Sequence, residues 1–182
     1  GGLGIIQYDC TFYEDTEIQF IVNNVHPLKF VYVTKGKLHH RFANEEKTHT
    51  VQQFQNAIIA SSDSHGHILN FKKNIQTSIF SLEIDRDAFR KKSSYQKDGM
   101  NAKMKNLFKD VKAEESFYYE GEYSLKMADL FKKIDDFEGS DFLNIIFMES
   151  IAYQTLVHQI SQFLDDQKKE KNRSLLRRTE VD

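Results

Sequence analysis

The sequence predicts an α+β fold, with a β-sandwich or β-barrel in the first half of the chain and helices in the second. About seven or eight short segments of alternating apolar and polar residues precede residue 85, which is the spacing expected of sandwiches and barrels. From residue 101 onward the apolar residues recur instead at helical spacing. Because all strands precede the helices, the pattern is not that of alternating βαβ units.

The segment Leu28–Phe42 gives the strongest strand signal, and its pattern predicts a β-hairpin. Side chains alternate across a strand, so the first half has two sets that face opposite ways. One set is Leu28, Phe30 and Tyr32, and the other is Lys29, Val31 and Val33. Gly36 supplies the positive φ that a tight turn needs. Alternation then resumes with Leu38, His40 and Phe42.

Further strands are expected on both sides of this segment. They are Gly4–Cys10, Thr16–Val22, Asn56–Ala60, Gly66–Phe71 and Ile75–Ile84. The segment Val51–Phe54 is too short to assign. Turn-forming residues separate these segments, and we therefore expect a β-barrel domain over residues 1–90.

Helices are predicted over most of the remaining chain. Asp85–Lys92 suits a helical turn. A helix from Asn101 onward has apolar residues at i, i+3, i+4 and i+7, namely Met104, Leu107, Phe108 and Val111. Ser124 is placed to cap the next helix, and Ser140 or Asp141 the longest one, which extends to about Gln167. We expect a helical region over residues 91–172 and the start of a linker over residues 173–182.

Composition limits the classes of partner. The formal net charge is −2, whereas a protein that binds the nucleic-acid backbone needs a clustered excess of Lys and Arg. The single cysteine, Cys10, excludes an internal disulfide and fits a reducing compartment. No apolar run approaches the roughly 20 residues that span a bilayer, and nothing at the N-terminus is typical of a signal peptide. We therefore expect a cytoplasmic protein with no membrane contact.

Histidines provide the candidate metal ligands. His65 and His67 lie two residues apart, which on a strand would put both imidazoles on one face. With His40 or Glu83 as a third ligand, such a set suits non-haem iron or a related ion. However, His39 and His40 are adjacent, so their rings face opposite ways. We expect no metal and no other cofactor, with these histidines at strand ends or in a barrel mouth.

No arrangement of residues predicts catalysis. Cys10 has no evident partner, and a lone cysteine is usually packed. Serines 61, 62 and 64 lie in a turn without a G-x-S-x-G context. We therefore expect that the chain is not an enzyme.

Aromatic and aliphatic residues of the predicted sheet are candidates for the lining of an internal ligand site. They are Phe20, Phe30, Tyr32, Leu38, His40, Phe42 and Phe80. Tyr32 and His40 would be the polar groups that orient a ligand. The alternative is that these side chains fill the barrel by themselves.

The longest predicted helix has an apolar stripe that predicts a homodimer. Its members are Phe142, Ile146, Tyr153, Leu156, Ile160 and Phe163. A pair of helices has more apolar surface than one small sheet can cover. The alternative is that the stripe packs on the sheet or on the helix Leu125–Ile134.

The run Phe30–Leu38 resembles the F-x-Y-V-x-x-G segment that opens the sensor domain of AraC-type transcription regulators. Gly121–Leu125 and the long helix resemble the helical part of these sensors, and Leu175–Asp182 resembles the linker to their DNA-binding half. The resemblance covers nearly the whole chain.

This resemblance implies a cupin-like jelly-roll barrel that receives an unknown small-molecule effector, followed by an αα-hairpin that dimerises. It also implies that DNA is bound only through a C-terminal helix-turn-helix domain that is not in this chain. Two alternatives remain. One is a metal-dependent cupin enzyme, a dioxygenase or isomerase, and the other is a ligand-binding protein without a DNA-binding domain.

Overall fold

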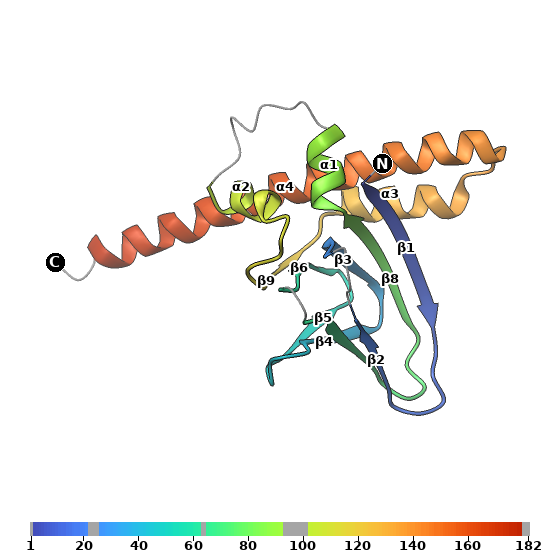
Figure 1. Cartoon of the computed structure of the whole chain (residues 1–182), viewed down its shortest axis with the longest axis horizontal. Helices are drawn as coiled ribbons and strands as arrows, with labels where there is room; N and C mark the ends of the chain where they lie inside the picture. The colour runs from blue at the N-terminus through green and yellow to red at the C-terminus, as the bar shows by residue number, and fades with distance from the viewer. Residues whose placement is uncertain (1, 22–25, 63–64, 93–101, 180–182) are drawn as a thin grey trace.

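Nine strands and four helices make up the described chain (Figure 1). This computed structural model describes residues 2–21, 26–62, 65–92 and 102–179. The strands are β1 Leu3–Cys10, β2 Thr16–Phe20, β3 Leu28–Lys35, β4 Lys37–Phe42, β5 Thr48–Gln52, β6 Gln55–Ala60, β7 His67–Phe71, β8 Thr77–Ile84 and β9 Phe117–Glu122. The helices are α1 Arg86–Lys92, α2 Ala102–Lys109, α3 Leu125–Asp136 and α4 Asp141–Thr179.

The strands form two antiparallel sheets that face each other. One sheet has the order β1-β8-β3-β6-β9 and the other the order β2-β7-β4-β5. The chain crosses repeatedly from one sheet to the other, as in a double-sheet jelly roll. The predicted fold class, a jelly-roll barrel followed by helices, is therefore confirmed.

The predicted β-hairpin at Leu28–Phe42 is wrong in its pairing. The turn lies at Gly36, as expected, but β3 pairs with β6 and β8 while β4 pairs with β5 and β7. The two strands thus enter different sheets. Alternation locates strands and turns, but it does not determine which strands pair.

The region expected to be helical also contributes β9, which pairs with β6 at the edge of the larger sheet. The helix α4 continues through residue 173, where a linker was expected to begin. Ser124 precedes α3 as predicted, but its side chain makes no capping hydrogen bond. The predictions at Val22, at Asn101 and at residues 180–182 lie outside the described residues.

Although α4 has 39 residues, no described helix has an apolar stretch sufficient to cross a membrane.

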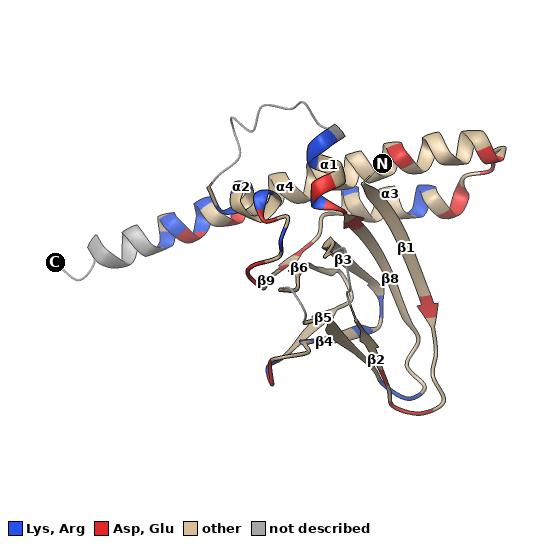
Figure 2. Cartoon of the chain, viewed as in Figure 1, with Lys and Arg blue, Asp and Glu red and all other residues tan. Residues whose placement is uncertain are grey.

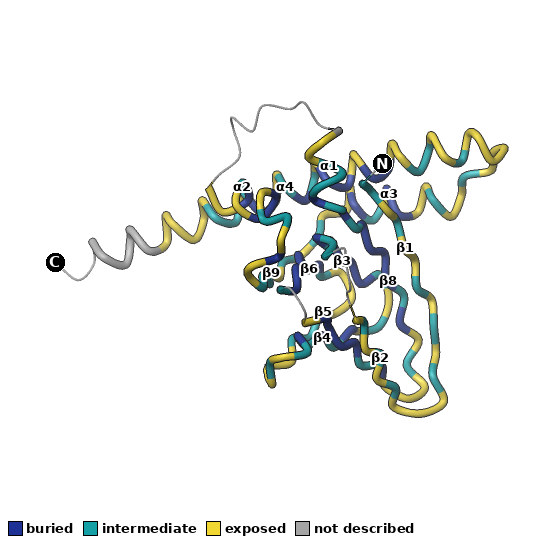
Figure 3. The backbone as a smooth tube through the Cα atoms, viewed as in Figure 1, coloured by how far each residue is buried: buried dark blue, intermediate teal, exposed yellow. Residues whose placement is uncertain are grey.

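Two cores lie on the two faces of the larger sheet. Between the sheets, Val31 and Val33 of β3 pack with residues such as Leu38. On the other face, Phe30 and Tyr32 of the same strand pack against α3 and α4. Figure 3 shows the buried residues concentrated where these layers meet. The larger sheet is thus covered on both sides, by the smaller sheet and by the helices.

Two glycines are required by close approaches of the backbone. Gly36 has a φ of 73°, a value that favours glycine, and a Cβ there would collide with the carbonyl oxygen of Gln76. A Cβ on Gly66 would collide with the carbonyl oxygen of Phe20. By contrast, a Cβ on Gly4 would lie 4.0 Å from its nearest neighbour, the carbonyl oxygen of Glu83.

These contacts predict a clear difference among three substitutions. Gly66→Ala and Gly36→Ala should each lower the free energy of unfolding by about 1–3 kcal/mol, because the backbone has to move to admit the methyl group. Gly4→Ala is the matched control and should change stability by less than about 1 kcal/mol. Urea denaturation followed by circular dichroism measures all three. Equal effects at the three positions would contradict the strand arrangement.

Candidate functional site

A small cavity lies in the core between the two sheets of the jelly roll. Its volume is ≈ 20 Å³, which is about enough for one water molecule. The cavity is lined by Tyr8, Lys29, Val31, Leu38, His40, Ile59, His67, Leu69, Ile79, Ser81 and Glu83. Apolar side chains thus surround a small group of polar ones, which is the usual composition of a small-molecule site.

Lys29 and Glu83 form an ion pair at the wall of the cavity. The two residues are opposite each other on β3 and β8, and Lys29 Nζ lies 2.7 Å from Glu83 Oε1. The side chains are only 12% and 17% exposed, so water screens the pair weakly. An ammonium group has three N–H donors, and this contact uses one of them. The pair therefore neutralises its own charge while it keeps donors for a polar ligand.

His40 is fully buried, and both of its ring nitrogens lack a hydrogen-bond partner. Burial lowers the pKa of His40 to about 3, with smaller effects of the charges at His49 and Lys29. The imidazole is therefore neutral at physiological pH and offers one donor and one acceptor. Ser81 Oγ is also buried and unpartnered. Because an unpaired buried polar group costs about 1–3 kcal/mol, a molecule that bonds to these groups would be held tightly.

His67 forms a second neutral imidazole beside the first. Its ring centroid lies 5.6 Å from that of His40 and 5.0 Å from that of Phe20, on which it stacks. Burial lowers the pKa of His67 to about 3, and the nearby charge of Lys29 acts in the same direction. Tyr118 of β9 also stacks on His40, with ring centroids 5.8 Å apart.

The geometry does not favour the metal site considered from the sequence. His65 is exposed and lies before β7, so the expectation that it shares a strand face with His67 is wrong. Glu83 is engaged by Lys29. His39 faces away from His40, as expected, with its Nδ1 2.9 Å from Thr50 Oγ1. In the part of the chain that the structure describes, no three His, Cys, Asp or Glu side chains come together as metal ligands would.

The predicted lining set divides between the two cores. Phe20, Leu38, His40 and Phe42 lie in or against the core between the sheets. Phe30, Tyr32 and Phe80 lie in the core under the helices, so placing them inside the barrel was wrong. Both β3 and β8 are buried on both faces. Their apolar pattern therefore could not indicate which face looks into the barrel.

Sequence reasoning missed Lys29, Ser81 and Tyr8 as members of the cavity wall. A signal for Lys29 was available, because it is the one charged residue among the apolar residues at 28–33. A lysine at such a position is expected to be paired if it is buried. Ser81 and Tyr8 had no comparable signal, since short polar and aromatic residues are common in strands.

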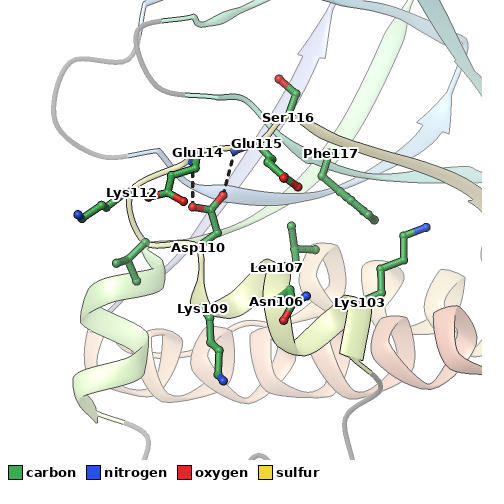
Figure 4. Close-up of a pocket in the computed structure, with 11 residues that line it drawn as sticks. Lys103, Asn106, Leu107, Lys109, Asp110, Lys112, Glu114, Glu115, Ser116 and Phe117 are labelled. Atoms are coloured by element: carbon green, nitrogen blue, oxygen red, sulfur yellow. Dashed lines mark hydrogen bonds between the residues drawn. The ribbon is translucent and has the colours of Figure 1, made fainter.

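A wider hollow of ≈ 570 Å³ lies between α2 and the start of β9 (Figure 4). Its central carboxylate, Asp110, accepts hydrogen bonds from the backbone N–H groups of Glu114 and Glu115 at 2.9 and 3.4 Å. Asp110 also lies 3.6 Å from the buried guanidinium of Arg86. These contacts close the turn after α2, and we therefore assign this hollow a structural role.

The predicted dimerisation residues lie on two adjacent faces of α4. Phe142, Ile146 and Tyr153 are exposed. Leu156 and Phe163 are buried in the core of their own chain, so including them in an interface was wrong, and Ile160 packs against the same core. Exposed Val157, which is 62% accessible, continues the outer face and was missed.

Comparisons with known proteins place this fold. The family model for the regulatory protein PchR N-terminal domain matches residues 1–175. No curated protein sequence matches the chain. An apo ToxT variant from Vibrio cholerae has a similar structure, with a TM-score of 0.52 and 13% identity over 94% of this chain and 58% of that one.

Two further solved structures are less similar. ToxT from Vibrio cholerae bound to (E)-4-(8-methylnaphthalen-1-yl)but-3-enoic acid gives a TM-score of 0.49 and 13% identity, over 81% of this chain and 54% of that one. A mutant of Bacillus subtilis oxalate decarboxylase gives a TM-score of 0.35 and 12% identity, over 77% of this chain and 37% of that one. The chain thus spans a little over half the length of the ToxT structures that it matches.

The buried histidines predict a pH dependence of stability. In the unfolded chain a histidine binds a proton below about pH 6.5, whereas folded His40 and His67 do so only near pH 3. Between these values the unfolded state binds more protons, so the free energy of unfolding should fall as the pH is lowered, by up to about 1.4 kcal/mol per pH unit for each histidine. Urea denaturation between about pH 6.5 and 4.5 measures this slope. The slope should become shallower in His40→Leu and in His67→Leu. A slope that is unchanged in both variants would show that these two histidines are not the buried, neutral groups responsible for it.

Proposed function

The chain belongs to the family of PchR regulatory protein N-terminal domains, and we propose that it is the effector-sensing and dimerisation part of a bacterial transcription regulator. This membership confirms the resemblance to AraC-type sensors found in the sequence. In the proposal, a small molecule binds inside the barrel of a cytoplasmic homodimer, and a separate domain binds DNA. We also propose that the chain has no catalytic activity of its own.

The polar cavity is the observation that carries the proposal. A protein that needed only a stable core would be better served by apolar side chains at the positions of His40 and Ser81, because unpartnered buried polar groups destabilise the fold. These groups converge with the Lys29–Glu83 pair on one space. Since that space holds about one water, an effector of larger size has to displace side chains. Binding is thereby linked to a change of conformation.

Strand β3 connects the cavity to the long helix. Val31 lines the cavity, and the next residue, Tyr32, points to the opposite face and donates a hydrogen bond from its hydroxyl to Gln159 Oε1 of α4 at 2.7 Å. Displacement of Val31 by an effector would therefore also move Tyr32, which is hydrogen-bonded to α4. A ligand that binds one of two such arrangements more tightly shifts the population toward it.

The distribution of charge supports an indirect contact with DNA. Figure 2 shows Lys and Arg interleaved with Asp and Glu along the helices. On α4 the pairs Lys168–Asp165 and Lys169–Asp166 lie 3.7 and 3.6 Å apart. Interleaved charges of both signs do not form the basic surface that phosphate binding needs. We therefore assign DNA binding to a separate domain of the whole regulator.

The outer face of α4 supports dimerisation. Ile146, Tyr153 and Val157 are 49%, 40% and 62% exposed. They follow one another at steps of seven and four residues, which keep them on one side of a helix, as in a helix–helix seam. Phe142, which is 69% exposed, extends this face toward the start of the helix. Large apolar side chains that stay exposed along one side of a helix are typical of an interaction site. We propose that the same face of a second copy covers it.

Filling the cavity should abolish effector binding. Ser81→Leu removes an unpartnered hydroxyl and occupies the cavity, so metabolites that raise the melting temperature of the chain should have no effect on this variant. A ligand at a hundred times its dissociation constant should stabilise the unmodified chain by about 2.7 kcal/mol. Ser161→Leu, at an exposed position on α4, is the control. Equal stabilisation of both variants would place the effector elsewhere.

Charged substitutions on α4 should separate association from folding. Ile146→Glu and Val157→Glu should give folded monomers, because they place a charge in the proposed seam while both side chains are exposed within one chain. Leu156→Ala should instead lower the free energy of unfolding by about 2–5 kcal/mol, because Leu156 is 6% exposed and belongs to the core. Sedimentation equilibrium and urea denaturation measure the two properties. A dimer that survives both glutamate substitutions would rule out this interface.

A further inference from the structure

A second hollow lies outside the barrel, between the outer face of the larger sheet and α3. Its volume is ≈ 410 Å³, which is within the range of small-molecule sites. It is lined by Gln7, Tyr8, Asp9, Thr34, Lys35, Phe54, Ser78, Ile79, Phe80, Tyr123, Ala128, Phe131, Lys132 and Asp135. The sheet provides one wall and α3 the other, so a molecule bound here would contact both.

Aromatic rings dominate the apolar part of this lining. Phe131 of α3 lies 4.5 Å from Phe80 of β8 and 5.7 Å from Tyr123, measured between ring centroids. Phe54 lies 6.2 Å from Tyr123 at the rim. Ala128 is the smallest side chain that α3 contributes to the lining. A flat ring in the hollow would therefore lie against a wall of aromatic side chains, with which aromatic ligands pair favourably.

Phe54 has a backbone conformation that favours glycine. Its φ is 68°, and this left-handed conformation costs a non-glycine residue roughly 1–2 kcal/mol. Its backbone is fixed there by two hydrogen bonds, from Phe54 N to Val33 O at 3.0 Å and from Tyr123 N to Phe54 O at 3.1 Å. The ring itself is 58% exposed. Glycine would suit both the backbone and the solvent better, so the choice of phenylalanine points to a contact with another molecule.

The charges around the hollow balance. Two carboxylates, Asp9 and Asp135, lie among the lining residues with two ammonium groups, Lys35 and Lys132. Hydrogen bonds from Gln76 and Ser78 lower the pKa of Asp9, which keeps its carboxylate ionised. The rim thus has no net attraction for an anion or a cation, and either ion would lose hydration on entering, which an uncharged ligand would not. A zwitterion can place each of its charges beside an opposite one.

We propose that this hollow is a second small-molecule site, which holds a flat aromatic ligand without net charge between Phe54 and the aromatic residues of the sheet and α3. The proposal does not depend on an effector in the barrel. In this proposal the side chain of Phe54 lies at the rim of the hollow and covers the ring of the bound ligand. It also gives the chain a second point at which a small molecule can act on the contact between the barrel and the helices.

Indole is a suitable probe, because the chain contains no tryptophan. Its fluorescence can be excited at wavelengths that the tyrosines of the chain hardly absorb. Titration of indole into the full chain should give saturable binding. The zwitterion tryptophan should also bind, and the anion indole-3-acetate and the cation tryptamine should bind more weakly than indole. Tighter binding of either ion than of indole would overturn the charge argument.

Two variants test the location. Phe54→Gly should weaken indole binding at least tenfold and yet raise the melting temperature, because it relieves the backbone and removes an exposed ring. Ala128→Leu should also weaken binding at least tenfold, because it fills the hollow from the side of α3. Tyr13→Gly, which removes an aromatic residue that is 89% exposed on the loop between β1 and β2, is the control and should bind indole like the unmodified chain.

The remaining outcomes are also decisive. Absence of saturable indole binding, or unchanged binding in both Phe54→Gly and Ala128→Leu, would overturn the proposal. Loss of indole binding in Ser81→Leu, with binding retained in Phe54→Gly, would place the probe inside the barrel. That result would reject the second site and leave the proposed sensing function intact.

Discussion

The structure depends on one sheet that is buried on both of its faces. Within β3, every residue from Phe30 to Val33 is buried, and Leu82 and Ile84 of β8 are fully buried as well. Neither cover can be removed without exposing a continuous apolar surface, so the barrel and the helices form one cooperative unit. For this reason the sequence boundary near residue 90 does not divide the core. The return of the chain in β9, which pairs with β6, binds the two parts further.

The two faces of this sheet carry side chains of different size, and this difference creates the functional space. Toward the helices the sheet presents Phe30, Tyr32 and Phe80. Toward the barrel it presents the smaller Val31, Val33 and Ile79. Close packing demands that volumes match across each layer. The smaller residues therefore leave room inside the barrel for imidazole and ammonium groups, which a face of large aromatic residues would have filled.

The sequence predicts local features of this molecule well because they depend on neighbouring residues. Alternation located most of the strands, although β5 was not assigned, and Gly36 located a turn. The recurrence of Met104, Leu107 and Phe108 located α2, which ends at Lys109, before the fourth predicted residue, Val111. Which strands pair depends on contacts between distant residues, so the hairpin at this turn was predicted wrongly. Of the polar residues in the cavity wall, His40 was predicted. Lys29 stood out in the sequence as a charge among apolar residues, but its partner Glu83 is brought beside it only by the pairing of β3 with β8. The edge strand β9 gave too short a signal among helices.

The contact between α4 and the sheet explains how a small change in the barrel could reach a distant partner. Gln159, which is 1% exposed, accepts hydrogen bonds from Tyr32 and Asn56, while its own Nε2 and the Oδ1 of Asn56 have no partner. Such polar contacts in an apolar layer favour one register of the helix over others, because a shifted helix would leave more groups unpaired. Two buried polar atoms remain unpaired even in this register, so it is less stable than a fully bonded contact would be. Because α4 extends well beyond the sheet (Figure 1), a small rotation at Gln159 becomes a large displacement at its far end.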